Sequence, residues 1–164
     1  MIQMRDSQMA IGSKSNRARE TEWSFVELVI GGKFLDPQKV SKVVGMPPDS
    51  CGKRGELASS KSKRIRKAGS WVLESNHSNW RIVSQMKNIL KRVAPIKERL
   101  RKLIREDATV ERAYLLVAFS PPEGRPGASY SFPAGLVEEF ASVGLDIVVS
   151  LYFYEERTRG HPSI

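Results

Sequence analysis

The sequence predicts an α+β domain in which helices pack on one face of a four-stranded, mixed or antiparallel sheet, in a ferredoxin-like arrangement. Apolar stretches typical of strands alternate with amphipathic helical stretches in the order β-α-β-α(α)-β-α-β. The 164 residues are enough for one domain with a core, and 40% hydrophobic and 27% charged residues are ordinary for a globular protein. A small three-layer α/β fold is the alternative, because each strand pair is joined by a segment long enough for a parallel crossover.

A strand and a well-delimited helix open the folded part of the chain. Residues 23–31 are rich in β-branched and large apolar residues, which favour a buried strand. Asp36 can cap the N-terminus of a following helix, and Pro37 suits its first position, where no N–H is needed. Gly45 can take the left-handed conformation that ends a helix. We therefore expect a helix over 36–44 in which these three residues have structural roles.

The remaining elements follow the same two periodicities. A short strand over 69–75 places Trp71 in the core, an interpretation that we prefer to a ligand platform. An amphipathic helical stretch from about 79 to 105 is broken at Pro95, which cannot continue a regular helix. A short helix stopped by Gly144 is also expected in a structural role. This helix, over 133–143, lies between the last two strands, over 111–120 and 145–154.

Both ends of the chain lack an apolar face. Residues 1–22 are polar and basic, and we interpret them as a disordered basic tail. Residues 157–164 are charged and contain Pro and Gly, so we expect a flexible C-terminal tail. The sequence therefore predicts a single α+β domain over residues 23–156 between two tails.

The connection between residues 46 and 69 carries the most concentrated positive charge. Between residues 53 and 67 its one acid is Glu56, and it contains no aromatic residue that could stack on a base. Loops of this length inside a compact domain are usually functional or disordered. Because Lys and Arg attract acidic surfaces and phosphates, this loop is the candidate contact surface, and a merely solvated loop is the other interpretation. The candidate partner-binding residues are Lys53, Arg54, Lys61, Lys63, Arg64, Arg66 and Lys67.

The net charge of the chain indicates the chemistry of a partner. It is formally +9, with an isoelectric point near 9.9, which favours acidic partners. No apolar run approaches the ~20 residues that span a bilayer, and the N-terminus lacks the apolar core of a signal peptide. Cys51 is the single cysteine, so no intrachain disulfide can form, and a reducing, cytoplasmic compartment is expected.

Residue patterns typical of catalysis or metal binding are missing from the sequence. His77, His161 and Cys51 do not stand at ligand spacing from one another. The glycine-flanked segment around Lys53 lacks the full phosphate-loop pattern. We therefore expect no metal, no cofactor and no enzymatic activity.

Several short motifs occur together in a recognisable order. Residues 25–48 read F-V-E-L-V-I-G-G-K-F-L-D-P-Q-K-V-S-K-V-V-G-M-P-P, and K-R-G follows at 53–55. Gly69, Trp71 and Ser75 then form G-x-W-x-x-x-S, before a mid-helix proline and a closing helix that ends in V-G. From about residue 23 to 154, this order resembles the bacterial domain-of-unknown-function 4279 family. The family's last strand often reads D-x-D-x-Y, whereas this chain keeps Asp146 but has Ser150 among apolar residues.

The resemblance implies a small α+β domain of the bacterial cytoplasm and no particular activity. By analogy, members of the family are similar to the small immunity proteins found beside polymorphic toxins. Our first hypothesis is a non-catalytic protein-interaction module, of which an immunity-type inhibitor is one form. It would bind an acidic protein through the basic loop and the helical stretch 81–105. The alternative is a nucleic-acid-associated protein that binds phosphates through residues 53–67.

Overall fold

The computed structural model describes residues 23–58, 63–75, 81–120 and 131–152. Its elements in chain order are β1 (Ser24–Gly32), α1 (Pro37–Val44), β2 (Ser50–Gly52), β3 (Gly69–Glu74), α2 (Ile82–Val93), the 3₁₀ turn η2 (Ala94–Ile96), α3 (Lys97–Glu106), β4 (Arg112–Phe119), α4 (Ala134–Val143) and β5 (Asp146–Leu151). The two expected tails, 1–22 and 157–164, lie outside the described residues, as do residues 153–156 of the expected domain.

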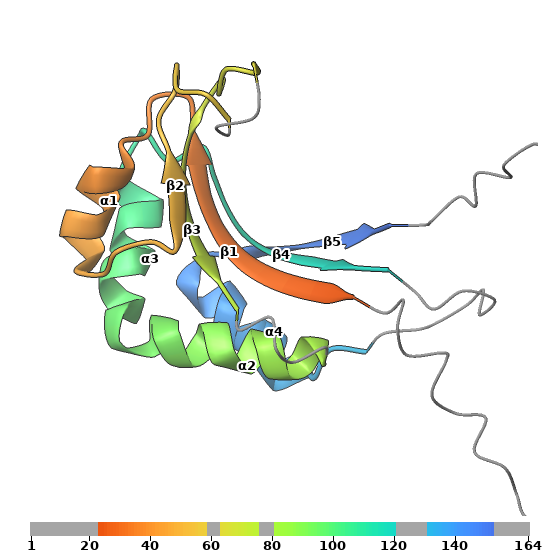
Figure 1. Ribbon diagram of the computed structural model, residues 1–164. Helices are drawn as coiled ribbons and strands as arrows, with labels where there is room; N and C mark the ends of the chain where they lie inside the picture. Colours follow the sequence, from red (N-terminus) through yellow and green to blue (C-terminus); the bar gives the residue numbers. More distant parts are fainter. Residues whose placement is uncertain (1–22, 59–62, 76–80, 121–130, 153–164) are drawn as a thin grey trace, which may run out of the picture.

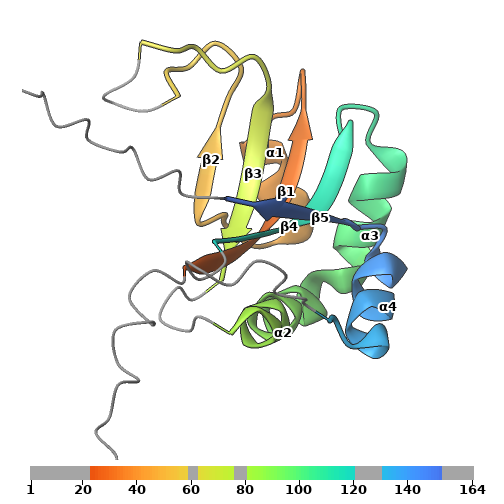
Figure 2. The same cartoon turned by 90° about the vertical axis from the view of Figure 1, so that its right-hand side faces the viewer.

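The strands form one mixed sheet in the order β2-β3-β1-β4-β5. β1 is antiparallel to both of its neighbours, β3 and β4, and β2 is antiparallel to β3, whereas β5 runs parallel to β4. The helices α1 to α4 lie together on one face of this sheet (Figure 1, Figure 2). Within the described part of the chain, the other face carries no helix.

The α+β class and the single helix layer are confirmed, but the expected four strands are five. The additional strand, β2, reads Ser-Cys-Gly and has no alternating apolar pattern, so only its pairing with β3 makes it a strand. The parallel β4–β5 pair, joined through α4 as a crossover, also differs from the all-antiparallel sheet of a ferredoxin-like arrangement. The three-layer alternative is not observed either, because the described helices occupy one face.

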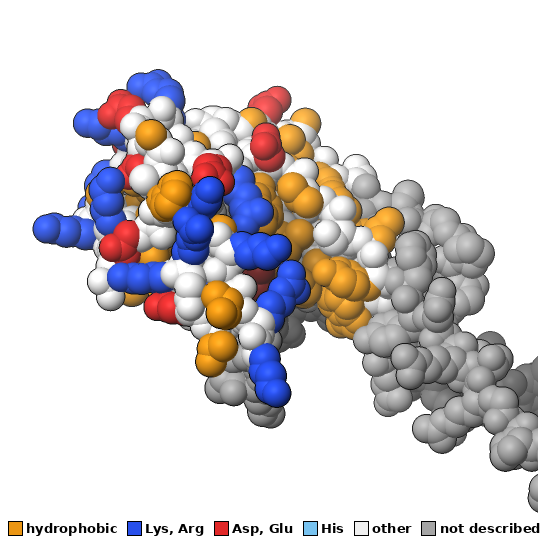
Figure 3. All heavy atoms as spheres, turned by 90° about the horizontal axis from the view of Figure 1, so that it is seen from above, with side chains coloured by type: hydrophobic (Ala, Val, Ile, Leu, Met, Phe, Trp, Pro, Cys, Tyr) orange, Lys and Arg blue, Asp and Glu red, His pale blue; other side chains and the backbone are white. Residues whose placement is uncertain are grey.

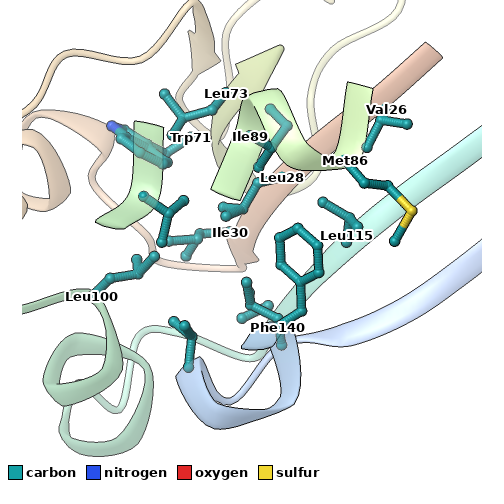
Figure 4. Packing of buried hydrophobic residues seen from close by; sticks show 14 of the residues in the cluster. Val26, Leu28, Ile30, Trp71, Leu73, Met86, Ile89, Leu100, Leu115 and Phe140 are labelled. Carbon is teal, nitrogen blue, oxygen red and sulfur yellow. The ribbon is translucent and has the colours of Figure 1, made fainter. Parts of the chain in front are cut away.

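One hydrophobic core lies between the helices and the sheet. Alternate residues of β1, namely Val26, Leu28 and Ile30, point into it, as the two-residue period of a strand requires. Side chains from α2, α3 and α4 pack against them (Figure 4). Trp71 of β3 is fully buried, and its Nε1 donates a hydrogen bond of 3.1 Å to Ser41 Oγ in α1. Trp71 therefore belongs to the core and joins α1 to the sheet.

Helix α1 has a cap at each end. The N-cap residue Asp36 accepts a hydrogen bond of 3.0 Å from the Gln38 N–H, which lowers the pKa of this carboxyl group, and Pro37 occupies the first turn. Gly45 follows the helix at φ 76°, and Gly144 follows α4 at φ 90°. At this left-handed φ a side chain would be strained, which explains glycine at both ends.

A buried polar network fixes the start of β1 against α2. The Ser75 Oγ donates to Gln85 Oε1 at 2.7 Å and accepts from the Val26 N–H at 3.3 Å. The Gln85 Nε2 in turn donates to the backbone oxygen of Ser24 at 3.1 Å. Ser75 and Gln85 are both almost fully buried, so these bonds satisfy polar atoms that water does not reach. This gives a physical reason for the serine in the G-x-W-x-x-x-S pattern.

Pro95 lies in η2, between α2 and α3, where a break in the helical stretch was expected. The two helices change direction at this point (Figure 1). No helix in the described segments is both long and apolar enough to cross a bilayer.

Candidate partner-binding site

The described part of the connection between β2 and β3 forms a two-stranded ribbon that extends from one end of the sheet (Figure 1). Leu57 and Ile65 face each other as an antiparallel bridge. Backbone bonds run across the ribbon from Ala58 N–H to Arg64 O at 2.8 Å and from Arg66 N–H to Glu56 O at 2.8 Å. The described part of this loop therefore has a defined backbone geometry.

Arg66 has a structural role in the loop, in addition to its charge. Its Nη2 donates to the Ala58 backbone oxygen at 3.1 Å, and its Nη1 lies 3.4 Å from Ser70 Oγ at the start of β3. The side chain is half-buried between the two sides of the ribbon. We infer that Arg66 holds the ribbon in shape, so it is a positioning residue of this site.

Lys53 is also occupied by contacts within the molecule. Its N–H donates to Glu56 Oε2 at 2.7 Å, and its Nζ lies 3.3 Å from Asp36 Oδ1 at the N-cap of α1. The acid of the loop, Glu56, is thus folded back onto the backbone. Lys53 anchors the base of the loop to α1, and its charge is partly balanced there.

Arg66 and the other described cations of the loop, except Lys53, line a shallow, open hollow of about 820 Å³ together with Lys33. No Asp or Glu is among the residues that line it, so every charged side chain in the lining of the hollow is a cation. Seen from above, many Lys and Arg side chains lie over this part of the molecule, with apolar and some acidic side chains among them (Figure 3). The lining residues are Lys33, Arg54, Gly55, Lys63, Arg64, Ile65, Arg66 and Lys67. Lys61, the remaining candidate, lies outside the described residues.

An aromatic residue that the sequence did not place here completes the surface. Phe34, in the turn between β1 and α1, has 67% of its surface exposed. The Lys33 Nζ and the Arg54 Cζ lie 5.3 and 5.2 Å from the centre of its ring, at cation–π distance. Leu57 and Ile65, paired on the ribbon, are 57% and 58% exposed. We call Phe34, Leu57, Ile65 and the lining residues of the hollow the basic surface.

Phe34 could have been noticed from one signal, a large apolar residue in a short turn between a strand and a capped helix. The helical stretch 81–105 does not extend the basic surface as a whole. The loop stands at one end of the sheet and α2 at the other, so they do not form one continuous surface (Figure 1, Figure 2). In the described ranges, no group of three or more His, Cys, Asp or Glu is arranged to hold a metal ion.

Comparison with known proteins places the chain in a family. Neither the curated proteins nor the solved structures provided a match. The model of one family, described as Domain of unknown function (DUF4279), matches residues 19–154, which is most of the chain. This range contains every described strand and helix together with the basic surface. The protein therefore belongs to the DUF4279 family.

Proposed function

We propose that this protein acts by binding an acidic protein partner through the basic surface, and that it carries out no catalysis. The observation that carries the proposal is the hollow lined by Lys and Arg without any Asp or Glu, beside exposed Phe34, Leu57 and Ile65. An immunity-type inhibitor, which neutralises another protein by covering it, would use a surface of this kind.

The combination of charge and exposed apolar area favours a protein as partner. Protein interfaces have an apolar centre that excludes water and a polar rim that sets orientation. Phe34, Leu57 and Ile65 can supply such a centre, because more than half of each residue is exposed. The surrounding cations would attract an acidic partner over a Debye length of ~10 Å at 0.1 M salt.

A nucleic acid is the second candidate, and Phe34 is the observation that favours it. An exposed aromatic ring beside Lys33 and Arg54 can stack on a base while the cations contact phosphates. Leu57 and Ile65 argue for the protein partner, because aliphatic side chains offer no flat face for stacking. The two candidates therefore differ in which exposed side chains they need.

The test compares two triple charge reversals with the same change in net charge. The loop variant carries Lys63→Glu, Arg64→Glu and Lys67→Glu, and spares the positioning residue Arg66. The control variant carries Lys42→Glu, Lys87→Glu and Lys91→Glu, at exposed sites on α1 and α2. Wild-type and variant proteins are immobilised, and untreated or nuclease-treated lysate is passed over each at low and at moderate salt.

We expect wild type and control to retain the same acidic protein, and the loop variant to lose it. Retention should also fall as salt increases, because the cations act through screened charge. Equal retention by all three proteins would remove the basic surface as the contact site. Loss of retention after nuclease treatment, with direct binding of a single-stranded oligonucleotide that weakens steeply with salt, would establish the nucleic-acid alternative instead.

A further inference from the structure

β5 is an edge strand, and the described residues give its edge none of the usual protection. Natural edge strands are usually very short, or carry Pro, Lys or a bulge that prevents pairing with another chain. β5 spans Asp146–Leu151, contains no Pro, Lys or Arg, and has Asp146 as its one charged residue. Apart from Asp146, its exposed side chains are apolar: Val148, Val149 and Leu151 are 41%, 47% and 52% exposed. Such a strand can pair with a further strand.

The backbone groups on the open edge can be assigned from one hydrogen bond. The N–H of Tyr152, directly after β5, donates to the Phe119 oxygen of β4 at 3.0 Å. Because successive strand residues direct their backbone groups to opposite sides, even-numbered residues of β5 face β4. The N–H and C=O groups of Ile147, Val149 and Leu151 therefore face the open edge.

The side chains on the helix side of β5 are also only partly covered. Ile147, Val149 and Leu151 lie opposite Leu115, Val117 and Phe119 of β4, whose side chains belong to the core. Ile147 packs against this core, but β5 then runs away from α4, beyond the helices (Figure 1). Val149 and Leu151 thus present apolar surface next to unpaired backbone on a strand of the described chain.

We propose that β5 pairs antiparallel with β5 of a second copy of this chain, about a two-fold axis at Val149. In this register Val149 lies opposite the second copy's Val149, and Ile147 lies opposite its Leu151. All outward-facing backbone groups of the strand are then paired, by roughly six hydrogen bonds in total. A two-fold axis at Val148 would place Leu151 opposite Leu145, which precedes β5 and is buried, so fewer residues of the strand would pair.

The self-pairing is also compatible with charge, which is the argument for a second copy as the occupant. Asp146 lies at one end of β5, so the antiparallel register places it opposite Tyr152 and far from the other Asp146. The opposed pairs between these ends are apolar or involve the small Ser150. Symmetry thus brings no like charges together on the described strand, although each chain carries a net charge of +9.

The dimer should be weak and should respond to salt in the opposite sense to partner binding. One short strand and a few half-exposed side chains offer less than the ~800 Å² per partner that stable interfaces bury. The chains as a whole repel each other, so added salt should strengthen the dimer by screening that repulsion. The basic surface, by contrast, should lose its partner as salt is added. The two proposals therefore stand or fail separately.

Sedimentation velocity of the full chain, from roughly 1 to 300 μM and at two salt concentrations, tests the proposal. We expect wild type to shift from monomer to dimer over this range, and Val149→Lys and Val149→Glu each to remain monomeric. An equimolar mixture of these two variants should form the dimer again, because position 149 opposes itself and the mixed pair joins opposite charges. Val148→Lys, on the adjacent residue of similar exposure, faces Ser150 of the second copy and should retain most of the dimer.

Amide hydrogen exchange provides a second test that needs no substitution. At high concentration the amides of Ile147, Val149 and Leu151 should become protected at least several-fold, whereas those of Val148 and Ser150, already bonded to β4, should change little. A wild-type protein that stays monomeric at the highest concentration would overturn the proposal. So would dimers of Val149→Lys alone that are as stable as those of wild type, or protection that is independent of concentration.

Discussion

The two edges of the sheet meet solvent in different ways. The edge formed by β2 is short, follows Pro47 and Pro48, and is bordered by charged contacts. The Asp49 Oδ1 accepts a hydrogen bond of 3.0 Å from Arg92 Nη2 of α2, and Lys53 contacts Asp36. The edge formed by β5 has no such contact in the described chain and exposes apolar side chains.

This difference gives the two edges of one sheet a different physical character. At the β2 side, short strand length, prolines and ion pairs prevent strand addition, and the adjoining loop presents charge. At the β5 side, the backbone itself is the available contact. A charged contact weakens with salt, whereas strand pairing between two basic chains does not. The predictions below test whether the two sides differ in this way.

The largest expected effect is on stability, at Trp71 on the β2 side. Trp71→Ala removes a fully buried ring and the hydrogen bond to Ser41, and should lower the free energy of unfolding by about 3–5 kcal/mol. Urea denaturation followed by circular dichroism measures this loss. A loss below about 1 kcal/mol would show that Trp71 does not anchor α1 to the sheet.

A smaller effect is expected at Arg92, which ties α2 to the β2 edge. Its guanidinium donates to the Asp49 carboxylate and, at 2.7 Å, to the Glu74 backbone oxygen. Arg92→Ala should cost about 1–2 kcal/mol, because a charged group and a carbonyl lose their partner at a half-exposed site. Lys91→Ala, its exposed neighbour on α2, is the matched control and should change stability little. Equal losses of unfolding free energy for both variants would show that the bonds of Arg92 to Asp49 and Glu74 do not stabilise the fold.

The pH dependence of the unfolding free energy should reveal a third charged contact, at the end of α3. The Lys39 Nζ donates to Asp107 Oδ2 at 2.8 Å, and Thr109 donates to Oδ1, which together lower the pKa of Asp107 to about 2. The pKa of the Asp107 carboxyl is lower in the folded chain than its ordinary value of 3.8. The ionised carboxylate therefore stabilises the fold fully above pH 3.8, and this contribution is lost as the pH falls toward 2.

Asp107→Asn should therefore cost about 1 kcal/mol at pH 7, after allowance for solvent screening. The difference in unfolding free energy between wild type and variant should shrink as the pH is lowered from 4 to 2 in denaturation experiments. A difference that stays constant over this interval would mean that the Asp107 charge does not contribute.

The smallest effect on the fold is expected at the exposed β5 edge. Leu151→Ala removes a side chain that is 52% exposed and should change the unfolding free energy of the monomer by about 0.5 kcal/mol or less. Dilute samples are required, because the same substitution weakens the proposed dimer. A large loss in dilute samples would show that the β5 edge is part of the core.

Local sequence patterns predicted most of the elements because each has a strong signal of its own. The apolar run before Gly31, the Asp36–Pro37 start and the glycines at 45 and 144 correspond to β1 and to the ends of α1 and α4. β2 has no such signal, since it is a strand only through its pairing with β3. Strand order and direction depend on long-range packing, which no local pattern encodes.

The candidate site could be predicted in part, for a similar reason. Composition alone located the positive charge between residues 53 and 67. It could not show that contacts within the molecule hold Arg66, which also lines the hollow, and Lys53, which does not. Phe34 was missed because it is distant in sequence and reaches the loop only when α1 and β3 pack together.

The difference between the two sides is tested most directly by amide NMR spectra of the full chain, recorded in two series. One series dilutes the protein from roughly 300 to 10 μM, and the other adds an acidic peptide that contains Leu and Phe residues, at fixed protein concentration. We predict that dilution changes the signals of residues 147–152, and that the peptide changes those of residues 33–34, 53–58 and 63–67. The same signals responding in both series, or a loop that does not respond to the peptide, would contradict this account.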